Sequence, residues 1–235
     1  MPENSPISVV FLIFPQITQL DVMGPAQVLS RLGNASVKLA WKTTEPVITD
    51  SGFPLLPTHS LDEISKADII CIPGGFGTIA LLEDNEVLDW VRKVSSTATW
   101  ITSVCTGALV LGAAGLLKGY KATTHWASLE QLAYFGAIPT KQRVVFDRTR
   151  VSGGGVTSGI DFALSLTEKI RGADHAKFVQ LSIEYDPMPP FDAGTPEKAD
   201  PEILNKYFDL VSLHAPDRDA KVAKIASELG FNSEP

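Results

Sequence analysis

The feature that most constrains the fold is a regular alternation of short apolar runs with segments of helical pattern. The runs are rich in β-branched and aromatic residues and are apolar almost throughout, which is typical of strands buried on both faces. The clearest runs are Val9–Phe14, Val37–Trp41, Asp68–Ile72 and Trp100–Val104. Between them the sequence predicts a helix from about Gly24 to Arg31, a hairpin within residues 42–60, and one helical segment that follows Gly75 and ends near Lys93. A strand–helix–strand order of this kind predicts an α/β fold, with a mostly parallel sheet covered by helices on both faces.

The second half of the chain continues this pattern and then changes character. Strands are predicted at Arg143–Asp147 and Arg150–Ser152, and helices at 159–170 and 176–185. A Pro-rich segment follows, and a final helical part begins near residue 201. We predict one main domain over residues 1–190 and an extension over residues 191–235 that packs on it, because so short a piece cannot build its own core.

Composition excludes several classes of protein. The formal net charge is −7 and no basic run is present, which argues against a nucleic-acid surface. No apolar run reaches the length of a membrane span, and the first residues lack the basic region of a signal peptide. Two cysteines do not make a disulfide framework, so a reducing cytoplasm is expected. Four scattered histidines without helical spacing predict no metal site.

Cys105 is the leading candidate for a catalytic residue. It follows the strand Trp100–Val104 and precedes a predicted helix at 108–114, and the carboxyl ends of strands are where open parallel sheets carry their sites. A sharp turn there lifts a nucleophile out of the sheet, and the N–H groups of the next helix are expected to favour a thiolate. The alternative is a packing role, which fits Cys71 in the middle of a strand.

Two other loops are expected at the same edge of the sheet. Asp21 follows the first strand and is a candidate acid, although Asp is also a favoured helix N-cap. Gly74 and Gly75 follow the third strand and are candidates for substrate binding through backbone N–H groups, or else form a tight turn. The N–H groups of Gly75 and Thr106 together predict an oxyanion-type site.

Three further patterns carry two interpretations each. Gly75–Ala80 matches the dinucleotide pattern G-x-G-x-x-A, but the next strand lacks the acidic residue that this site requires, so a nicotinamide cofactor is excluded. His125 and Trp126 are candidate pocket residues, or structural ones. Gly154 lies in a Gly-Gly-Gly turn that either borders the pocket, with mobility that helps the next helix to shift, or is an ordinary loop.

Together these segments resemble the ThiJ/PfpI superfamily, a flavodoxin-like α/β group related to class I glutamine amidotransferases. The resemblance extends from Ile7 to Tyr185, and the stretch Tyr185–Gly194 adds a likeness to the isonitrile hydratases of that superfamily. The motifs that carry it are Leu20–Pro25 (LDVMGP), Ile72–Gly75 (IPGG), Ser103–Gly107 (SVCTG), Ala113–Leu117 (AAGLL), Ala122–Trp126 (ATTHW) and Ser152–Gly155 (SGGG).

The resemblance implies roles for three residues: Cys105 as nucleophile, Asp21 as its hydrogen-bonded acid and Thr106 as part of the pocket. It implies a hydro-lyase that adds water to a small isonitrile, R–N≡C, through a thioimidate on the cysteine. The product is an N-substituted formamide, and no cofactor is needed. The resemblance also implies a homodimer.

Two alternatives from the same superfamily stay open at this point. One is a non-catalytic sensor of small molecules, as in AraC-type regulators; the other is a glyoxal hydratase or deglycase. The regulators add helix-turn-helix motifs, for which residues 201–235 offer little length and no net positive charge. Protease-like members have His directly after the cysteine, whereas Thr106 follows it here.

Overall fold

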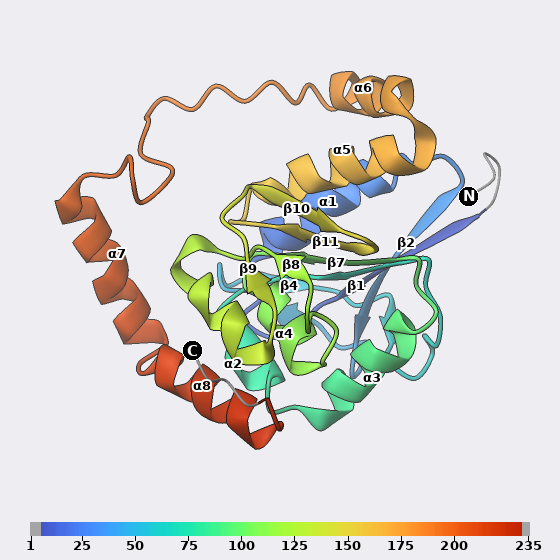
Figure 1. Cartoon of the computed structure of the whole chain (residues 1–235). Coiled ribbons are helices and arrows are strands. Elements are labelled where there is room, and N and C mark those ends of the chain that lie inside the picture. Colours follow the sequence, from blue (N-terminus) through green and yellow to red (C-terminus); the bar gives the residue numbers. More distant parts are fainter. Residues whose placement is uncertain (1–5, 232–235) are drawn as a thin grey trace.

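A central sheet of seven strands organises the chain (Figure 1). A computed structural model describes residues 6–231, and the expectation about the first few residues lies outside that range. The strand order is β10-β11-β7-β6-β1-β2-β5, and all neighbours are parallel except β10 and β11. The predicted α/β fold is confirmed. The strands are β1 (Ile7–Leu12), β2 (Ala35–Trp41), β5 (His59–Ser60), β6 (Ile69–Ile72), β7 (Trp100–Val104), β10 (Val144–Asp147) and β11 (Arg150–Gly153).

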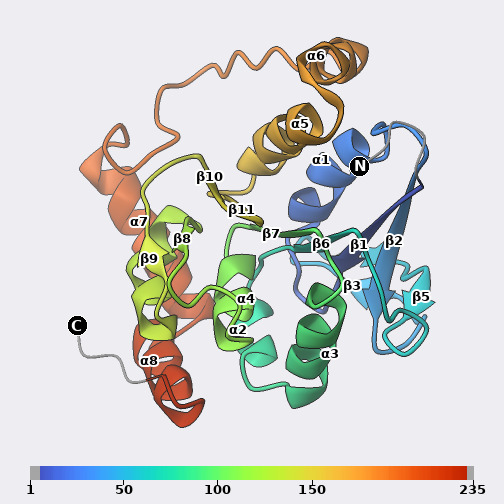
Figure 2. The same cartoon turned by 45° about the vertical axis from the view of Figure 1, so that its right-hand side comes forward.

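Helices cover both faces of this sheet, as the alternation predicts (Figure 2). On one face α1 and α5 pack against each other, and on the other lie α2, α3 and α4. A further helix, α6, continues from α5. Their bounds are α1 (Gln19–Leu29), α2 (Thr78–Leu81), α3 (Asn85–Ser95), α4 (Gly107–Ala113), α5 (Ser158–Arg171) and α6 (Ala173–Ser182).

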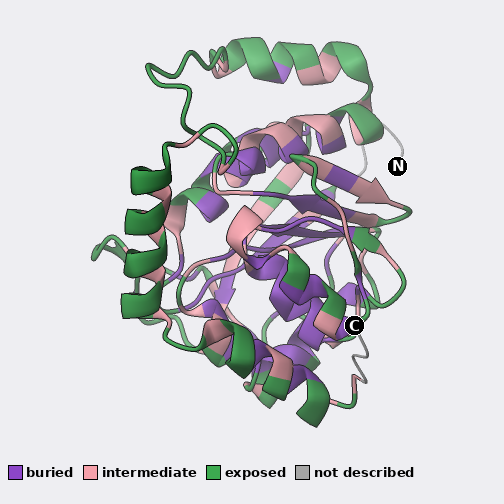
Figure 3. Cartoon of the chain, turned by 60° about the vertical axis from the view of Figure 1, so that its left-hand side comes forward, coloured by how far each residue is buried: buried purple, intermediate pink, exposed green. Residues whose placement is uncertain are grey.

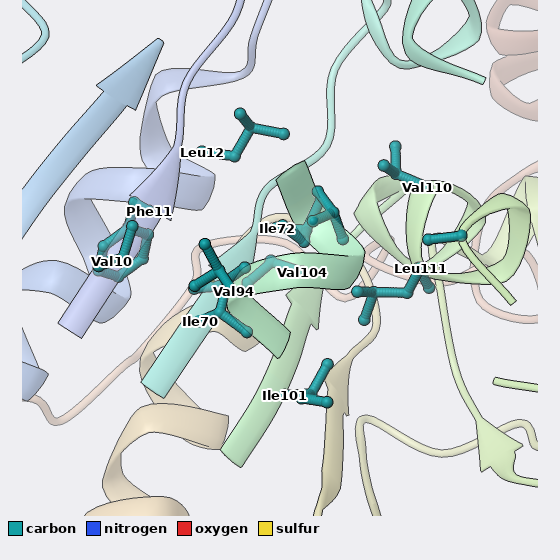
Figure 4. Close-up of a cluster of buried hydrophobic side chains, with 14 of the residues drawn as sticks. Val10, Phe11, Leu12, Ile70, Ile72, Val94, Ile101, Val104, Val110 and Leu111 are labelled. Carbon is teal, nitrogen blue, oxygen red and sulfur yellow. The ribbon is translucent and has the colours of Figure 1, made fainter. Parts of the chain in front are cut away.

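The core lies on the two faces of the three central strands. Figure 4 shows side chains of β1, β6 and β7 beside those of the flanking helices. Val10, Ile70 and Val104 are completely buried, which explains why these runs are apolar without alternation. Each such side chain contributes about 1.5–3 kcal/mol through its removal from water. This rigid centre holds the carboxyl ends of the strands in place.

The helix that follows β6 differs from the single predicted one. The chain forms α2 and α3, and Asp84 separates them as the N-cap of α3, accepting a hydrogen bond from Val87 N–H at 3.2 Å. A side chain that satisfies a free N–H in this way starts a new helix. Glu86 in the first turn and Arg92 in the last suit the helix dipole.

Two small sheets lie outside the central one. β3 (Val47–Ile48) and β4 (Pro54–Leu55) are antiparallel and confirm the hairpin predicted within residues 42–60. β8 (Lys121–Ala122) and β9 (Ile138–Pro139) are parallel and enclose two short 3-10 helices. These helices are η1 (Trp126–Ser128) and η2 (Glu130–Phe135).

The last part of the chain runs along the outside of the α/β unit. Residues 186–200 form an extended connection, which leads to α7 (Pro201–His214) and α8 (Arg218–Glu228) (Figures 1 and 3). α7 buries none of its residues fully, whereas α8 buries three against η2: Val222, Ile225 and Ala226. The division into domains at residue 190 stays a prediction. Within residues 6–231 every helix is too short or too polar to span a bilayer.

Candidate active site

Cys105 lies in a strained turn between β7 and α4. Its φ is 54°, in the left-handed region that a residue with a side chain occupies at a cost of about 1–3 kcal/mol. Hydrogen bonds on both of its backbone polar groups hold this conformation. The N–H of Cys105 donates to the carbonyl of Gly154 at 2.8 Å, and the Thr124 hydroxyl donates to the carbonyl of Cys105 at 2.6 Å. The sharp turn predicted at this position is therefore confirmed.

The cysteine side chain borders a small pocket of about 150 Å³. Cys105 itself is only 6% exposed, so a molecule reaches the sulfur through this pocket and not from open solvent. The walls are mostly hydrocarbon and come from segments far apart in the sequence. The lining residues are Thr18, Gly75, Phe76, Thr78, Ile79, Cys105, Thr106, Leu109, His125, Val156, Tyr207, Ala215 and Arg218.

Asp21 is a completely buried residue in the first turn of α1. The helix starts at Gln19, earlier than the predicted start at Gly24, so Asp21 is not in a loop. The N-cap interpretation is wrong, since the N-cap is Thr18 and the carboxyl of Asp21 faces another segment. Its Oδ2 accepts the N–H of Gly74 at 2.9 Å, and its Oδ1 accepts no hydrogen bond from the described residues.

The Asp21 carboxyl and the Cys105 thiol influence each other's ionisation. Burial raises the pKa of Asp21 to about 7, against the opposing effects of its hydrogen bonds with Gly74 and with the thiol. Burial also raises the pKa of Cys105 well above its usual range, and the negative charge of Asp21 adds to that rise. Two groups coupled in this way titrate as a pair. Above about pH 7 the pair holds a single proton.

The expected lowering of the Cys105 pKa is thus wrong. The N–H and hydroxyl of Thr106 do interact with the sulfur and lower its pKa. However, α4 is short and the sulfur is almost sealed from water, so the loss of solvation outweighs the helix N-terminus. At neutral pH the sulfur is therefore a thiol with a buried carboxyl beside it.

Gly75 lines the pocket and Gly74 precedes it, but the N–H groups of both are already occupied. Gly74 donates to Asp21, and Gly75 donates to the Thr106 hydroxyl at 3.1 Å. The predicted cradle from the N–H groups of Gly75 and Thr106 is therefore not open, because one donor is in use. Both positions need glycine: a Cβ on Gly74 would lie 2.6 Å from the Thr106 nitrogen, and Gly75 has a φ of 138°.

Thr106 belongs to a small hydroxyl cluster beside the sulfur. Its hydroxyl is 2.9 Å from that of Thr78, which donates in turn to the carbonyl of Gly75 at 2.7 Å. Thr78 is buried and lines the pocket, but it was not predicted as a site residue. The helical pattern of this segment explains it equally well as a core position, so no sequence signal marks it.

The structure brings only one of the three remaining candidates to the pocket. His125 lines it, and burial together with Arg218 lowers the pKa of His125 to about 4. Its Nδ1 accepts the N–H of Ala127 at 3.3 Å, so the neutral ring carries its proton on Nε2. Trp126 lies outside the pocket and packs on α7. Gly154 also lies outside it, and its carbonyl accepts the hydrogen bond from the N–H of Cys105.

Other parts of the site were not predicted from the sequence. Phe76, Tyr207 and Arg218 line the pocket, and the last two come from α7 and α8. Cys71, in contrast, is fully buried in β6 with a pKa raised to about 12, which fits the packing role. Within residues 6–231 no group of three His, Cys, Asp or Glu side chains is arranged to hold a metal ion.

The site therefore combines Cys105, in a strained turn after a central strand, with Asp21, in the helix that follows β1. The sequence around these two residues also matches a protein family. Residues 7–169 match the DJ-1/PfpI family. The chain belongs to this family. The match covers the whole central sheet and ends within α5, so α6, α7 and α8 lie beyond it.

Two named proteins and one crystal structure are similar to this chain. An isonitrile hydratase from Pseudomonas putida is 49% identical over 83% of this chain and 86% of its own length. The crystal structure of a ThiJ/PfpI family protein from Pseudomonas syringae has a TM-score of 0.89 and 39% identity, over 96% of this chain and 92% of that one. The transcriptional regulator CdhR of Pseudomonas aeruginosa is 28% identical over 60% of this chain and 41% of its own length.

Proposed function

We propose that the protein is an enzyme that hydrates isonitriles to N-substituted formamides. One observation carries this proposal: a buried carboxyl with a pKa of about 7 lies beside a cysteine in a small, mainly apolar pocket. Such a carboxyl both accepts and donates a proton near neutral pH, which the reaction requires. The 49% identity to the isonitrile hydratase of Pseudomonas putida supports the same activity.

The first step joins the sulfur of Cys105 to the terminal carbon of R–N≡C. As the S–C bond forms, the thiol proton moves to the Asp21 carboxylate, since both raised pKa values keep this proton within the pair. The same carboxyl then gives its proton to the former isonitrile carbon. The product of this step is a thioimidate, R–N=CH–S, on Cys105.

The second step adds water to the thioimidate carbon. Asp21 takes a proton from the water as its oxygen bonds to carbon, and the proton goes on to the nitrogen. The C–S bond then breaks, and R–NH–CHO leaves while the sulfur regains a proton from the intermediate hydroxyl. One isonitrile and one water give one formamide, and no oxidant or reductant takes part. The reaction as written therefore uses no cofactor.

Two pocket residues have narrower roles in this scheme. The N–H and hydroxyl of Thr106 stabilise negative charge on the sulfur during attack and departure, as their effect on the Cys105 pKa indicates. His125 stays neutral at pH 7, so it forms a wall of the pocket and does not serve as the acid. A reducing cytoplasm suits this chemistry, because Cys105 acts as a free thiol.

The direct test is incubation of the purified protein with a small alkyl isonitrile. Nuclear magnetic resonance follows the formyl proton of the product, and mass spectrometry of a rapidly quenched sample looks for a thioimidate adduct on Cys105. We expect formamide in many-fold excess over enzyme. Absence of formamide with a range of alkyl isonitriles would refute the hydratase proposal.

A sensor of small molecules is the second candidate, because the chain is also similar to the regulator CdhR. A sensor binds its ligand without converting it. The same incubation separates the two functions: saturable binding of an isonitrile or formamide with no turnover would favour the sensor. Release of formamide would favour the enzyme.

We also propose that the protein forms a homodimer. Exposed residues predominate on α6, on the extended segment and on α7 (Figure 3). Several of them have large apolar side chains. Exposed apolar surface of this kind marks interfaces between proteins. The residues are Phe178, Leu181, Met188, Phe191 and Leu213. Light scattering after size-exclusion chromatography should give twice the mass of one chain. The double variant L181E/F191E should lower this measured mass to that of the monomer.

A further inference from the structure

Arg218 introduces a positive charge into a pocket that is otherwise uncharged hydrocarbon and hydroxyl. It is the first residue of α8, and its side chain lines the Cys105 pocket together with Tyr207 and Ala215. Among the described residues that line this pocket, no other side chain is a cation or a carboxylate at neutral pH, since His125 is neutral. The chemistry of Cys105 and Asp21 gives this guanidinium no task.

The guanidinium of Arg218 is also incompletely used by the protein. One donor, on Nη2, goes to the carbonyl of Ala127 at 2.7 Å, and another goes to the Tyr207 hydroxyl. Within residues 6–231 no carboxylate forms an ion pair with Arg218. The neighbouring acid on α8, Asp219, instead accepts hydrogen bonds from Gln131 and Tyr134. A guanidinium has five N–H donors, so Arg218 has donors left for a bound molecule. Partial burial without a counter-charge costs free energy that a bound anion would recover.

Arg218 and Cys105 line the same small pocket. The isonitrile carbon must reach the sulfur, which lies beside Asp21 and Thr106. The R group then occupies the rest of this pocket, whose lining includes Leu109, Val156 and Arg218. A charged group on R therefore shares this space with the guanidinium.

We propose that the substrate of this enzyme is an isonitrile with a carboxylate on a short apolar R group, and that Arg218 binds this carboxylate. The inference rests on the proposed hydration and specifies its substrate class. A guanidinium matches a carboxylate with two parallel N–H···O hydrogen bonds, which a neutral R group cannot make. The small pocket volume limits R to a few carbon atoms.

The test compares two isonitriles that differ mainly in charge, isocyanoacetate and its methyl ester. The variants are R218M, which removes the charge and keeps the length, R218K, which keeps charge without the planar fork, and K221M as the control. Lys221 is an exposed cation one turn further along α8. For the wild type we expect a higher kcat/KM for isocyanoacetate than for the ester, through a lower KM.

The measured quantity is the ratio of kcat/KM for isocyanoacetate to that for the ester. R218M should lower this ratio about ten- to hundredfold, as expected for the loss of a charged hydrogen bond, and R218K should lower it less. K221M should leave it unchanged. A wild-type preference for the ester, or an R218M ratio equal to that of the wild type, would overturn the carboxylate site.

A binding measurement separates this inference from the hydratase proposal. Calorimetry with C105A, which cannot turn over, compares N-formylglycine, the product of isocyanoacetate, with N-formylglycine methyl ester. Tighter binding of the acid that R218M abolishes supports the carboxylate site even if no isonitrile is hydrated. Turnover of neutral isonitriles together with equal binding of acid and ester would support hydration and refute the role of Arg218.

Discussion

The hydroxyl of Thr124 donates a hydrogen bond to the carbonyl of Cys105 across 2.6 Å, within a fully buried contact. The bond ties the segment that follows β8 to the turn after β7 and fixes the carbonyl of a residue in a strained conformation. The Thr-Thr-His-Trp stretch selected from the sequence thus has a mechanical role in the site, besides the wall that His125 provides.

Replacement of Thr124 by Val should loosen this turn. T124V keeps the shape of the side chain but leaves the Cys105 carbonyl without a buried donor, which costs about 1–3 kcal/mol of unfolding free energy. We expect kcat/KM for isonitrile hydration to fall about tenfold or more. The control is T167V, which removes a buried hydroxyl bond to Ala163 within α5. Equal activity of T124V and wild type would contradict this role.

The two cysteines should respond in opposite ways to substitution by Ala. C105A should abolish formamide production, because no other group forms the thioimidate. C71A should keep the activity and cost about 1 kcal/mol of stability, since Cys71 packs inside β6. Initial rates and urea denaturation of both variants provide the comparison. Turnover by C105A at the wild-type rate would contradict the role of Cys105 as the nucleophile.

D21N should lower the rate severely while it preserves the hydrogen bond from Gly74. The amide oxygen still accepts that N–H, but the amide cannot exchange a proton with the sulfur. A loss of about 10²–10⁴ in kcat is expected for removal of a general acid or base. A loss of less than about tenfold, or roughly 1.4 kcal/mol, would reduce Asp21 to a structural residue.

The rate of the wild type should depend on pH through the pair of Asp21 and Cys105. Below about pH 7 the pair holds two protons, and the attacking sulfur has no base to accept its proton. The rate therefore rises as pH increases through about 7. It does not fall again until far into the alkaline range, because the second pKa is raised well above the usual range of a thiol. The residual activity of D21N should lack the rise near pH 7.

The ionised Asp21 carboxylate that the reaction requires should also make the folded protein less stable, and D21N should remove this effect. A free Asp titrates near 3.9, whereas Asp21 in the fold titrates at about 7, so the folded state binds this proton more tightly. The contribution of Asp21 to stability is therefore largest below about pH 4 and falls as pH rises to about 7. Between pH 5 and pH 8 the unfolding free energy should therefore fall less in D21N than in the wild type. An identical pH dependence would refute the raised pKa.

Gly75 should tolerate alanine far less well than another glycine of positive φ. G75A places a Cβ 2.6 Å from the nitrogen of Thr18 and keeps a φ of 138°, so the loop must move. We expect a loss of more than about 3 kcal/mol. G119A has a φ of 72° with open space around the added atom and should cost about 1–2 kcal/mol. Equal melting temperatures for both variants would disprove the close approach.

Much of the fold could be predicted because local signals and tertiary structure agree. The predicted strand Trp100–Val104 matches β7 at both ends, since a β-branched apolar run is followed directly by Thr-Gly and small helix formers. The start of α1 was missed because Gly24 and Pro25 resemble a helix beginning. The helix starts earlier and includes Pro25, whose ring packs near Gly159 of α5, a contact that no local pattern records.

The site was predictable in its position but not in its electrostatics. The sequence places Cys105 and Asp21 at one edge of the sheet, because parallel strands share a direction. It does not reveal how deeply each is buried, and burial is what raises both pKa values. Tyr207 and Arg218 were missed for a related reason: they reach the pocket only through the docking of α7 and α8, which depends on contacts between segments distant in sequence.

The walls that α7 and α8 add to the pocket have a consequence for biosynthesis. A ribosome makes Cys105 well before it makes Tyr207 and Arg218, so a growing polypeptide has its sulfur uncovered on one side until translation nears residue 218. During that interval oxidants and electrophiles in the cell meet the thiol without the shelter that the finished molecule provides.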